Sequence, residues 1–277
     1  MGEGPGNTRG EKLNQRGIEL ADRGWLDEAL CEFDRAIELD GQDPFPRINR
    51  ASVYVEQGRM LDALEDLLAA VKLAPDDPTT HYHLGALLTG YGHQLGKREL
   101  QISLAMDPDQ VDALLELGVC SADIGEFEEA EQAFRSALEL DPDDGLARRE
   151  LGVLLLDRGE VHEAIEHLKT ARQQLGSAEA EVDLGLAYLQ AGFLDKAESL
   201  LVEVLASDED NIFAHYNLAA IYAHQGRVDA CLLHLQRAAE IHAPSVREWL
   251  RDDPFFEAVR REEPFQRFAS AAIPDMG

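Results

Sequence analysis

Seven glycines divide the chain into units of nearly equal length. They are Gly24, Gly58, Gly92, Gly125, Gly159, Gly192 and Gly226, at separations of 34, 34, 33, 34, 33 and 34 residues. A constant period of this size is typical of repeat architectures, in which each unit buries its apolar face only against its neighbours. We therefore expect a row of similar units instead of a fold around one central core.

Each unit has the pattern of a helical hairpin. Apolar residues recur at helical spacing on both sides of the glycine, which indicates two amphipathic helices joined by a short turn. We expect all seven glycines to adopt the left-handed conformation that closes the end of a first helix. Small residues such as Gly17 and Gly118 let two helices approach closely, and large residues such as Phe33 and Phe134 fill the seam between them.

The period sets the expected boundaries of the units. They are 10–43, 44–77, 78–110, 111–144, 145–177, 178–211 and 212–243. Residues 1–9 are Gly-rich and polar and are expected to be disordered. Residues 244–277 abandon the repeat and carry Trp249, Phe255, Phe256, Phe265 and Phe268. We expect capping helices that cover the open apolar end of the stack, and a tail that folds into the protein's own groove is the alternative.

The unit at 111–144, VDALLELGVCSADIGEFEEAEQAFRSALELDPDD, resembles the tetratricopeptide repeat. That pattern has Leu-Gly and then Tyr in the first helix, and later Ala, a large apolar residue, Ala and Pro. The resemblance covers roughly residues 10–243. It implies an all-α, right-handed superhelical solenoid of about seven hairpins with a C-terminal helical cap. Three units depart from the pattern: the third is one residue short and reads LGKRELQISLAMDP, the fifth ends in QQLGS without proline, and the sixth has Val204 for Ala.

The charge and the apolar runs narrow the class of protein. The 277 residues include 54 acidic and 25 basic side chains, a net charge of −29. This charge disfavours nucleic acid and anionic membrane surfaces and favours cationic partners. The longest apolar runs, such as LGVLLL at 151–156, are too short to span a bilayer, so we expect no membrane insertion and a soluble, cytoplasmic protein.

The spacing of the cysteines and histidines does not fit a disulfide framework or a metal site. Three widely spaced cysteines suit neither a disulfide framework nor a zinc ribbon. Cys231 and His234 share a helix face, but structural zinc needs four ligands. His81 and His83 point in different directions on one helix and cannot share a metal. We therefore expect no enzyme, no catalytic residues, no cofactor and no metal site.

The resemblance implies that the first helices line a concave groove, which the second, fifth, ninth, twelfth and thirteenth residues of each unit face. Apolar residues in these slots form the expected groove floor: Ile48, Tyr82, Leu115, Val119, Val153, Val182, Leu186 and Tyr216. Packing between adjacent first helices is the alternative for the ninth and twelfth slots. Exposed apolar residues in a groove indicate a binding surface.

Carboxylates in the second and thirteenth slots form the expected acidic wall: Asp22, Glu56, Asp112, Asp123, Asp157 and Glu179. The four in the thirteenth slot lie in the last turn of a first helix, where an acid opposes the helix dipole at a cost of about 0.3 to 1 kcal/mol each. Binding of a cationic partner would explain them. An acidic surface without functional preference is the alternative.

These observations favour a non-catalytic scaffold or adaptor. Its groove would bind a basic amphipathic helix or an extended segment of a partner protein with Lys or Arg. The alternative is a regulatory sensor that takes a short peptide or a small apolar ligand and whose aromatic tail competes as an internal ligand. The exposed ends of stacked hairpins also allow a homodimer.

Overall fold

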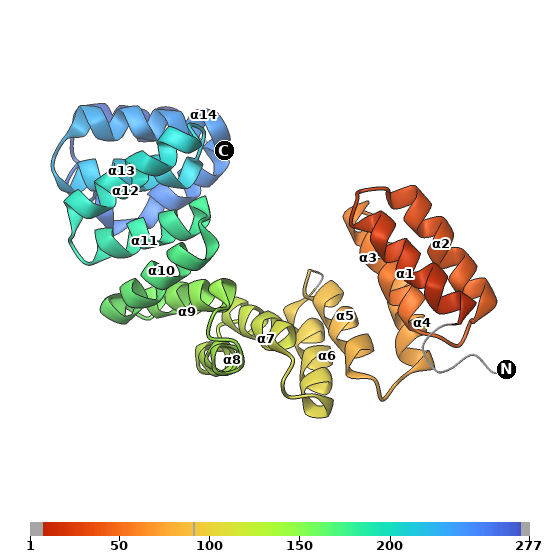
Figure 1. Ribbon diagram of the computed structural model, residues 1–277. Coiled ribbons are helices and arrows are strands. Elements are labelled where there is room, and N and C mark those ends of the chain that lie inside the picture. Colours follow the sequence, from red (N-terminus) through yellow and green to blue (C-terminus); the bar gives the residue numbers. More distant parts are fainter. Residues whose placement is uncertain (1–7, 91, 273–277) are drawn as a thin grey trace. The chain divides into compact units, whose positions relative to one another are not determined.

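The computed structural model describes residues 8–90 and 92–272, and within these ranges it contains helices and no strand (Figure 1). The all-α expectation is therefore confirmed. The chain forms two compact units that meet between Pro142 and Asp143. The first contains α1 (Arg9–Ala21), α2 (Leu26–Leu39), α3 (Phe45–Glu56), α4 (Met60–Leu73), α5 (Pro78–Thr89), α6 (His93–Met106), α7 (Val111–Asp123) and α8 (Phe127–Leu140).

The second unit continues the same alternation of first and second helices. It contains α9 (Gly145–Asp157), α10 (Val161–Leu175), α11 (Ala178–Gln190), α12 (Leu194–Ser207), α13 (Ile212–His224), α14 (Val228–Asp252), the 3₁₀ helix η1 (Pro254–Phe256) and α15 (Glu263–Ala272). In both units each odd-numbered helix up to α13 packs against the helix that follows it, as the hairpin pattern predicts. None of the helices in the described ranges has the length and apolarity needed to cross a membrane.

The turns of the hairpins contain the expected glycines, with one exception. Gly24, Gly58, Gly125, Gly159, Gly192 and Gly226 have φ between 69° and 78°, which confirms the left-handed conformation at six turns. The prediction is wrong for Gly92, whose φ of 170° is extended backbone. The reason is the shortened third unit, in which α5 ends at Thr89 and Gly92 directly precedes α6. Gly176, with φ 60°, caps α10 where the fifth unit lacks proline.

The hairpins are held together by contacts between small and large residues. A Cβ atom added at Gly17 would lie 2.5 Å from the Phe33 ring, and one added at Gly118 would lie 2.4 Å from the Phe134 ring. Both rings are almost fully buried. A side chain at either glycine would therefore force the two helices of its hairpin apart, because the rings have no free space to move into.

Both ends of the chain differ in detail from the sequence expectation. Residues 1–7 lie outside the described residues, but the expected disorder is wrong for residues 8 and 9. Thr8 and Glu11 form a capping box, with Glu11 N donating to Thr8 Oγ1 at 3.2 Å and Thr8 N donating to Glu11 Oε2 at 2.8 Å. At the other end, α14 continues past residue 243 through a kink at His242.

The C-terminal segment, residues 244–272, packs against the last repeat. Val246, Leu250, Phe256 and Phe265 are buried in one apolar cluster with the residues of α13. This is the position expected of a cap, because it covers apolar surface that no further hairpin would cover. Residues 273–277, the end of the expected tail, lie outside the described residues.

Substitution of Gly17 by Ala should lower the free energy of unfolding by about 1 to 3 kcal/mol, because the new methyl group meets the Phe33 ring. Gly10→Ala in the same helix is the matched control, since its Cβ would meet nothing closer than 3.9 Å. Urea denaturation of both variants measures the difference. Equal stability of the two would contradict the role assigned to the close contact.

Candidate functional site

The expected groove floor is only partly available in the first unit. Tyr82, Leu115 and Val119, on α5 and α7, are partly exposed. Ile48 is 2% exposed and packs in an apolar cluster with Ala51 of its own helix. The assignment of Ile48 to the floor is therefore corrected: its side chain fills space between helices and offers no surface to a partner.

In the second unit Val153 and Leu186 are partly exposed, whereas Val182 and Tyr216 are buried. The assignment of Val182 and Tyr216 to an exposed groove floor is therefore wrong, because both side chains are buried. Val182 packs in the apolar cluster that α13 and the C-terminal segment share, so it is covered by neighbouring side chains.

Tyr216 is covered by the C-terminal segment. Its hydroxyl donates a hydrogen bond to Asp253 Oδ2 at 2.8 Å, and its ring lies 5.2 Å from Trp249 and 5.4 Å from Phe256. The neighbouring second-slot residue Phe213 stacks on Trp249 at 5.3 Å. Two groove slots of the last repeat are thus occupied by the protein's own chain.

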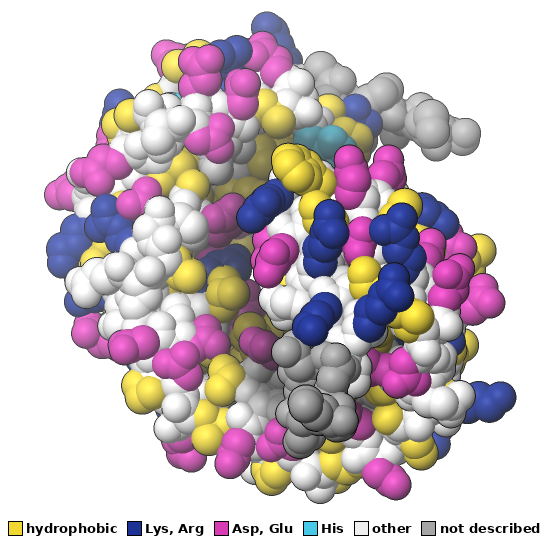
Figure 2. All heavy atoms as spheres, turned by 45° about the vertical axis from the view of Figure 1, so that its right-hand side comes forward, with side chains coloured by type: hydrophobic (Ala, Val, Ile, Leu, Met, Phe, Trp, Pro, Cys, Tyr) yellow, Lys and Arg dark blue, Asp and Glu magenta, His cyan; other side chains and the backbone are white. Residues whose placement is uncertain are grey.

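All six residues of the expected acidic wall are exposed. Asp22 is the C-cap residue of α1, and Glu56, Asp123 and Asp157 are the last residues of α3, α7 and α9. Figure 2 shows Asp and Glu side chains over the whole of the face drawn, with Lys and Arg side chains among them. The acidic wall therefore lies on a generally acidic surface. That its carboxylates bind a cationic partner stays a prediction.

Basic groups interrupt the acidic wall at two places. His93 Nδ1 lies 3.4 Å from Asp123 Oδ2 in the first unit. In the second unit, Arg149 Nε donates to Asp183 Oδ2 at 2.6 Å. Burial lowers the pKa of this guanidinium, but the negative charges of Asp183, Glu150 and Glu179 outweigh burial and raise it. Arg149 stands in the fifth slot of its repeat, so the sequence already contained the signal for a basic residue in the groove.

On α5 and α7 one floor residue and one wall residue come close together. Burial raises the pKa of Tyr82 to about 12, and the negative charges of Asp112 and Glu116 contribute. The pKa of Glu116 is itself raised, first by burial and then by Asp112. An aromatic face beside two carboxylates suits a cation, because a positive charge would relieve the repulsion between the carboxylates.

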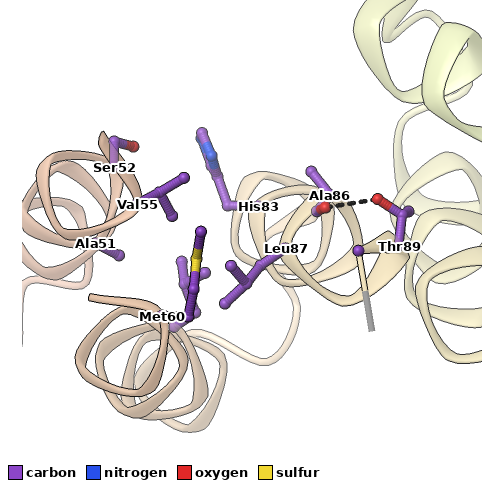
Figure 3. A pocket seen from close by; sticks show the side chains of 10 residues that line it. Ala51, Ser52, Val55, Met60, His83, Ala86, Leu87 and Thr89 are labelled. Atoms are coloured by element: carbon purple, nitrogen blue, oxygen red, sulfur yellow. Dashed lines mark hydrogen bonds between the residues drawn. The ribbon is translucent and has the colours of Figure 1, made fainter. Parts of the chain in front are cut away.

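A pocket of 610 Å³ lies between α3, α4 and α5 (Figure 3). Its lining includes Ser52 and Val55 of α3, Met60 of α4, and His83 and Ala86 of α5. Burial lowers the pKa of His83, so the imidazole is neutral at pH 7. Ser52, Val55 and Ala86 stand in groove slots, but those slots alone did not reveal the pocket, because Met60 and Leu67 of α4 complete its wall.

Several histidines and two of the three cysteines, Cys120 and Cys231, are buried or partly buried between helices, whereas Cys31 is exposed. His81 Nδ1 lies 2.8 Å from Glu99 Oε2 and His81 Nε2 lies 3.0 Å from Pro75 O, while His83 faces the pocket, as their predicted divergence requires. Burial raises the pKa of the Cys231 thiol to about 12, which keeps it protonated. Residues 8–90 and 92–272 hold no group of three or more His, Cys, Asp and Glu residues able to bind a metal.

His234 contacts a residue that the sequence did not suggest. Its Nδ1 lies 2.9 Å from Nδ1 of His215, whose Nε2 lies 3.0 Å from the Glu209 carbonyl oxygen. Burial and the neighbouring His215 lower the pKa of His234 to about 4, against an opposing contribution from Glu198. This pair joins α13 to α14 and is a structural feature sensitive to pH.

The helical pairs, the turn glycines and the small-to-large contacts agree with the comparison to known families. A tetratricopeptide repeat model matches residues 93–144, 122–179 and 182–246, together more than half of the chain, and a TPR repeat model matches residues 51–90. The chain belongs to the tetratricopeptide repeat family. The resemblance seen in the sequence is therefore confirmed, and with it the helical solenoid class of the fold.

Sequence relatives of this tetratricopeptide repeat protein match over short segments. It is 33% identical over 103 residues to the TPR repeat-containing thioredoxin TTL4 of Arabidopsis thaliana, which is 37% of this chain and 15% of that protein. It is 38% identical over 72 residues to tetratricopeptide repeat protein 36 of Caenorhabditis elegans, which is 26% of this chain and 40% of that protein. The chain thus spans well under half the length of either relative.

Solved structures share the fold at low identity. The pilus biogenesis factor PilW aligns with a TM-score of 0.68 at 21% identity, over 72% of this chain and 94% of PilW. The Cut9–Hcn1 assembly of the APC/C aligns with a TM-score of 0.74 at 16% identity, over 98% of this chain and 50% of that chain. YrrB, described as a TPR protein with an unusual peptide-binding site, aligns with a TM-score of 0.53 at 24% identity, over 66% of this chain and 95% of YrrB.

Acidification should destabilise the second unit through His234. The pKa of this histidine is lowered from about 6.5 to about 4 in the folded chain, so its contribution to stability is complete above pH 6.5 and is lost as the pH falls towards 4. Because the side chain is partly exposed, we expect a loss of about 1 to 2 kcal/mol between pH 7 and pH 5. Urea denaturation at both pH values measures it, and His234→Gln should remove this part of the pH dependence. An unchanged pH profile in that variant would contradict the assignment.

Proposed function

We propose that this tetratricopeptide repeat protein is a non-catalytic adaptor that binds a peptide or helix of a partner protein along its first helices. One observation supports this most directly: on α5 and α7 the partly exposed Tyr82, Leu115 and Val119 lie on the same two helices as the carboxylates of Asp112 and Glu116. Apolar side chains that internal packing covers only in part, beside acidic groups, suit an amphipathic and basic segment.

Similar proteins support the class of function. Tetratricopeptide repeats generally act as scaffolds for contacts between proteins, and YrrB is described as having a peptide-binding site. That description belongs to YrrB, whose fold this chain shares. The proposal for this chain rests on its own exposed side chains.

The chemistry of the reactive residue types also favours binding over catalysis. Burial raises the pKa of Cys120 to about 11 and that of Cys231 to about 12, so both thiols are protonated and poor nucleophiles at neutral pH. Both cysteines are buried in apolar surroundings, and the hydrogen bonds of His81 tie α5 to its neighbours. These groups are thus engaged in the structure of the repeats.

The contacts of Trp249 favour a second candidate function, a regulatory sensor with an internal ligand. Trp249 stacks on Phe213 at the end of the row of first helices, where a ligand of an open repeat would lie. Trp249→Ala separates the two readings, because Phe256 and Phe265 still hold the C-terminal segment in place. Tighter binding of a captured partner by this variant would favour the sensor, and unchanged affinity with lower stability would favour a simple cap.

The adaptor proposal predicts that partner binding depends on the α7 carboxylates. Asp112→Lys with Asp123→Lys should weaken a partner captured from the source cell by about tenfold or more and reduce the salt dependence of its binding. Glu128→Lys with Glu139→Lys is the matched control, since both residues are exposed on α8 and the change in net charge is the same. Titration of the captured partner by calorimetry at low and high salt checks the prediction. Equal affinity in both double variants would contradict the acidic recognition of the partner.

A further inference from the structure

Two cavities lie side by side along the first helices of the first unit and share the side chain of Ser52. The larger is the pocket of 610 Å³ between α3, α4 and α5. The smaller, of 230 Å³, is lined by residues of α1, α2 and α3, among them Ile18, Asp22 and Glu56. Because both lie within the first compact unit, their relative position is set by direct helix packing.

The two cavities occupy the same place in consecutive repeats but differ in chemistry. Each is bordered by the ninth-slot residues of its two first helices, which are Ile18 and Ser52 in the smaller cavity and Ser52 and Ala86 in the larger. The smaller cavity also has two thirteenth-slot carboxylates, Asp22 and Glu56. In the larger cavity the thirteenth-slot residue of α5 is Gly90, which carries no charge. An apolar pocket therefore adjoins an acidic one.

The larger cavity borders the irregular third repeat through α5. A Cβ atom at Gly96 of α6 would lie 2.7 Å from Thr89 N and 2.9 Å from Gly85 O, so only glycine permits the close approach of α6 to α5. In Figure 3, His83 and Leu87 project from α5 toward α3 and α4, whereas Ala86 and Thr89 lie farther from α3. The helix that forms one wall of the larger cavity, α5, is thus also the helix against which α6 packs most closely at Gly96.

The lining of the larger cavity suits an uncharged side chain. Val55 at its edge is 39% exposed, and Met60 and Leu87 supply further apolar surface. The neutral imidazole of His83 can offer a hydrogen bond but no charge. An aliphatic or aromatic side chain would gain by leaving water here, whereas a charged one would lose its hydration without compensation.

The smaller cavity suits a cation. Asp22 and Glu56 are exposed, and among the described residues the nearby cations pair elsewhere: Arg50 with Asp34 and Asp66, and Arg59 with Asp62. Both stand at the C-terminal end of a helix, where the negative end of the helix dipole adds to their own charge. A Lys or Arg placed between them would relieve both unfavourable interactions.

We propose that these two cavities together bind a two-residue motif in the partner segment. One apolar side chain of the motif enters the pocket between α3, α4 and α5, and one Lys or Arg contacts Asp22 and Glu56. The inference rests on the proposed adaptor function and adds to it the chemistry and the place of recognition. It excludes a purely apolar or an acidic partner segment at this site.

The distance between consecutive repeats sets the spacing of the motif. Packed helices lie about 8 to 10 Å apart, and neighbouring cavities are one repeat apart. In an extended polyproline-type segment, residues three apart point to the same side and are separated by about 9 Å. In a helical segment, residues seven apart are separated by about 10 Å on the same face. The motif is therefore an apolar residue and a cation three positions apart in an extended segment, or seven apart in a helix.

Synthetic peptides test the motif on the full chain. In one set a single Leu and a single Lys stand one to nine positions apart in a Gly/Ser/Pro background, and in a second set in an Ala/Gln helical background. Amide chemical shifts in ¹H–¹⁵N spectra of the protein report binding even when it is weak. We expect the strongest binding at a separation of three in the first set and seven in the second, with shifts in α3 and α5. Replacement of the Lys by Glu should weaken binding at least tenfold.

Variants of the protein test the contribution of each cavity to binding separately. Ala86→Trp should abolish binding by filling the larger pocket, and Ala105→Trp on the exposed face of α6 is its matched control. Asp22→Lys with Glu56→Lys should reverse the preference, so that the Glu peptide binds better than the Lys peptide. Glu38→Lys with Glu65→Lys, at exposed positions of α2 and α4, should leave the preference for Lys intact.

Several outcomes would overturn the motif. These are absence of binding by every peptide, binding that does not depend on the separation, and a preference for Lys that survives Asp22→Lys with Glu56→Lys. Self-association of the chain that Ala86→Trp abolishes would assign the cavities to a second copy and would equally overturn it. The adaptor function fails separately, if a partner captured from the cell is indifferent to the α7 variants described above.

Discussion

The close contact between a small residue on one helix and a large one on the next is the interaction on which this structure depends. Gly17 against Phe33 and Gly118 against Phe134 bring the two helices of a hairpin together, and each such contact leaves no room for a Cβ atom. A contact of this kind recurs at Gly17, Gly85, Gly118, Gly152 and Gly185, and Ala51 and Ala219 take the small position in the other two hairpins, so the repeats need no single central core. The other side of a first helix is then partly exposed, as at Tyr82 and Val119, or covered by other parts of the chain, as at Tyr216.

The fold could be predicted from the sequence because the small and large residues that make this contact recur at a constant spacing. The turn glycines, the small slots and the helical spacing are local and repeat every 33 or 34 residues. The residues wrongly assigned to the exposed groove floor have another explanation. Ile48 and Tyr216 stand in slots that face the groove in an average repeat, but here neighbouring side chains cover them, and burial depends on contacts between repeats that the period does not encode.

The irregular third repeat borders a candidate site. Its missing residue and its Gly96 shift α6 against α5, and Gly92 adopts extended backbone in place of the left-handed turn. A polar network compensates on the other side of the repeat, where Lys97 of α6 contacts both Glu126 and Glu129 of the next hairpin. The α5 helix of this irregular repeat also forms one wall of the 610 Å³ pocket.

The shared apolar cluster of α13 and the C-terminal segment also has a consequence for biosynthesis. Val246, Leu250, Phe256 and Phe265 leave the ribosome after the whole of α13, yet they bury the surface of that helix. Earlier hairpins can form as soon as the next one has been translated, whereas the last must wait for about thirty further residues. During that interval the apolar face of α13 lacks the side chains that bury it in the folded chain.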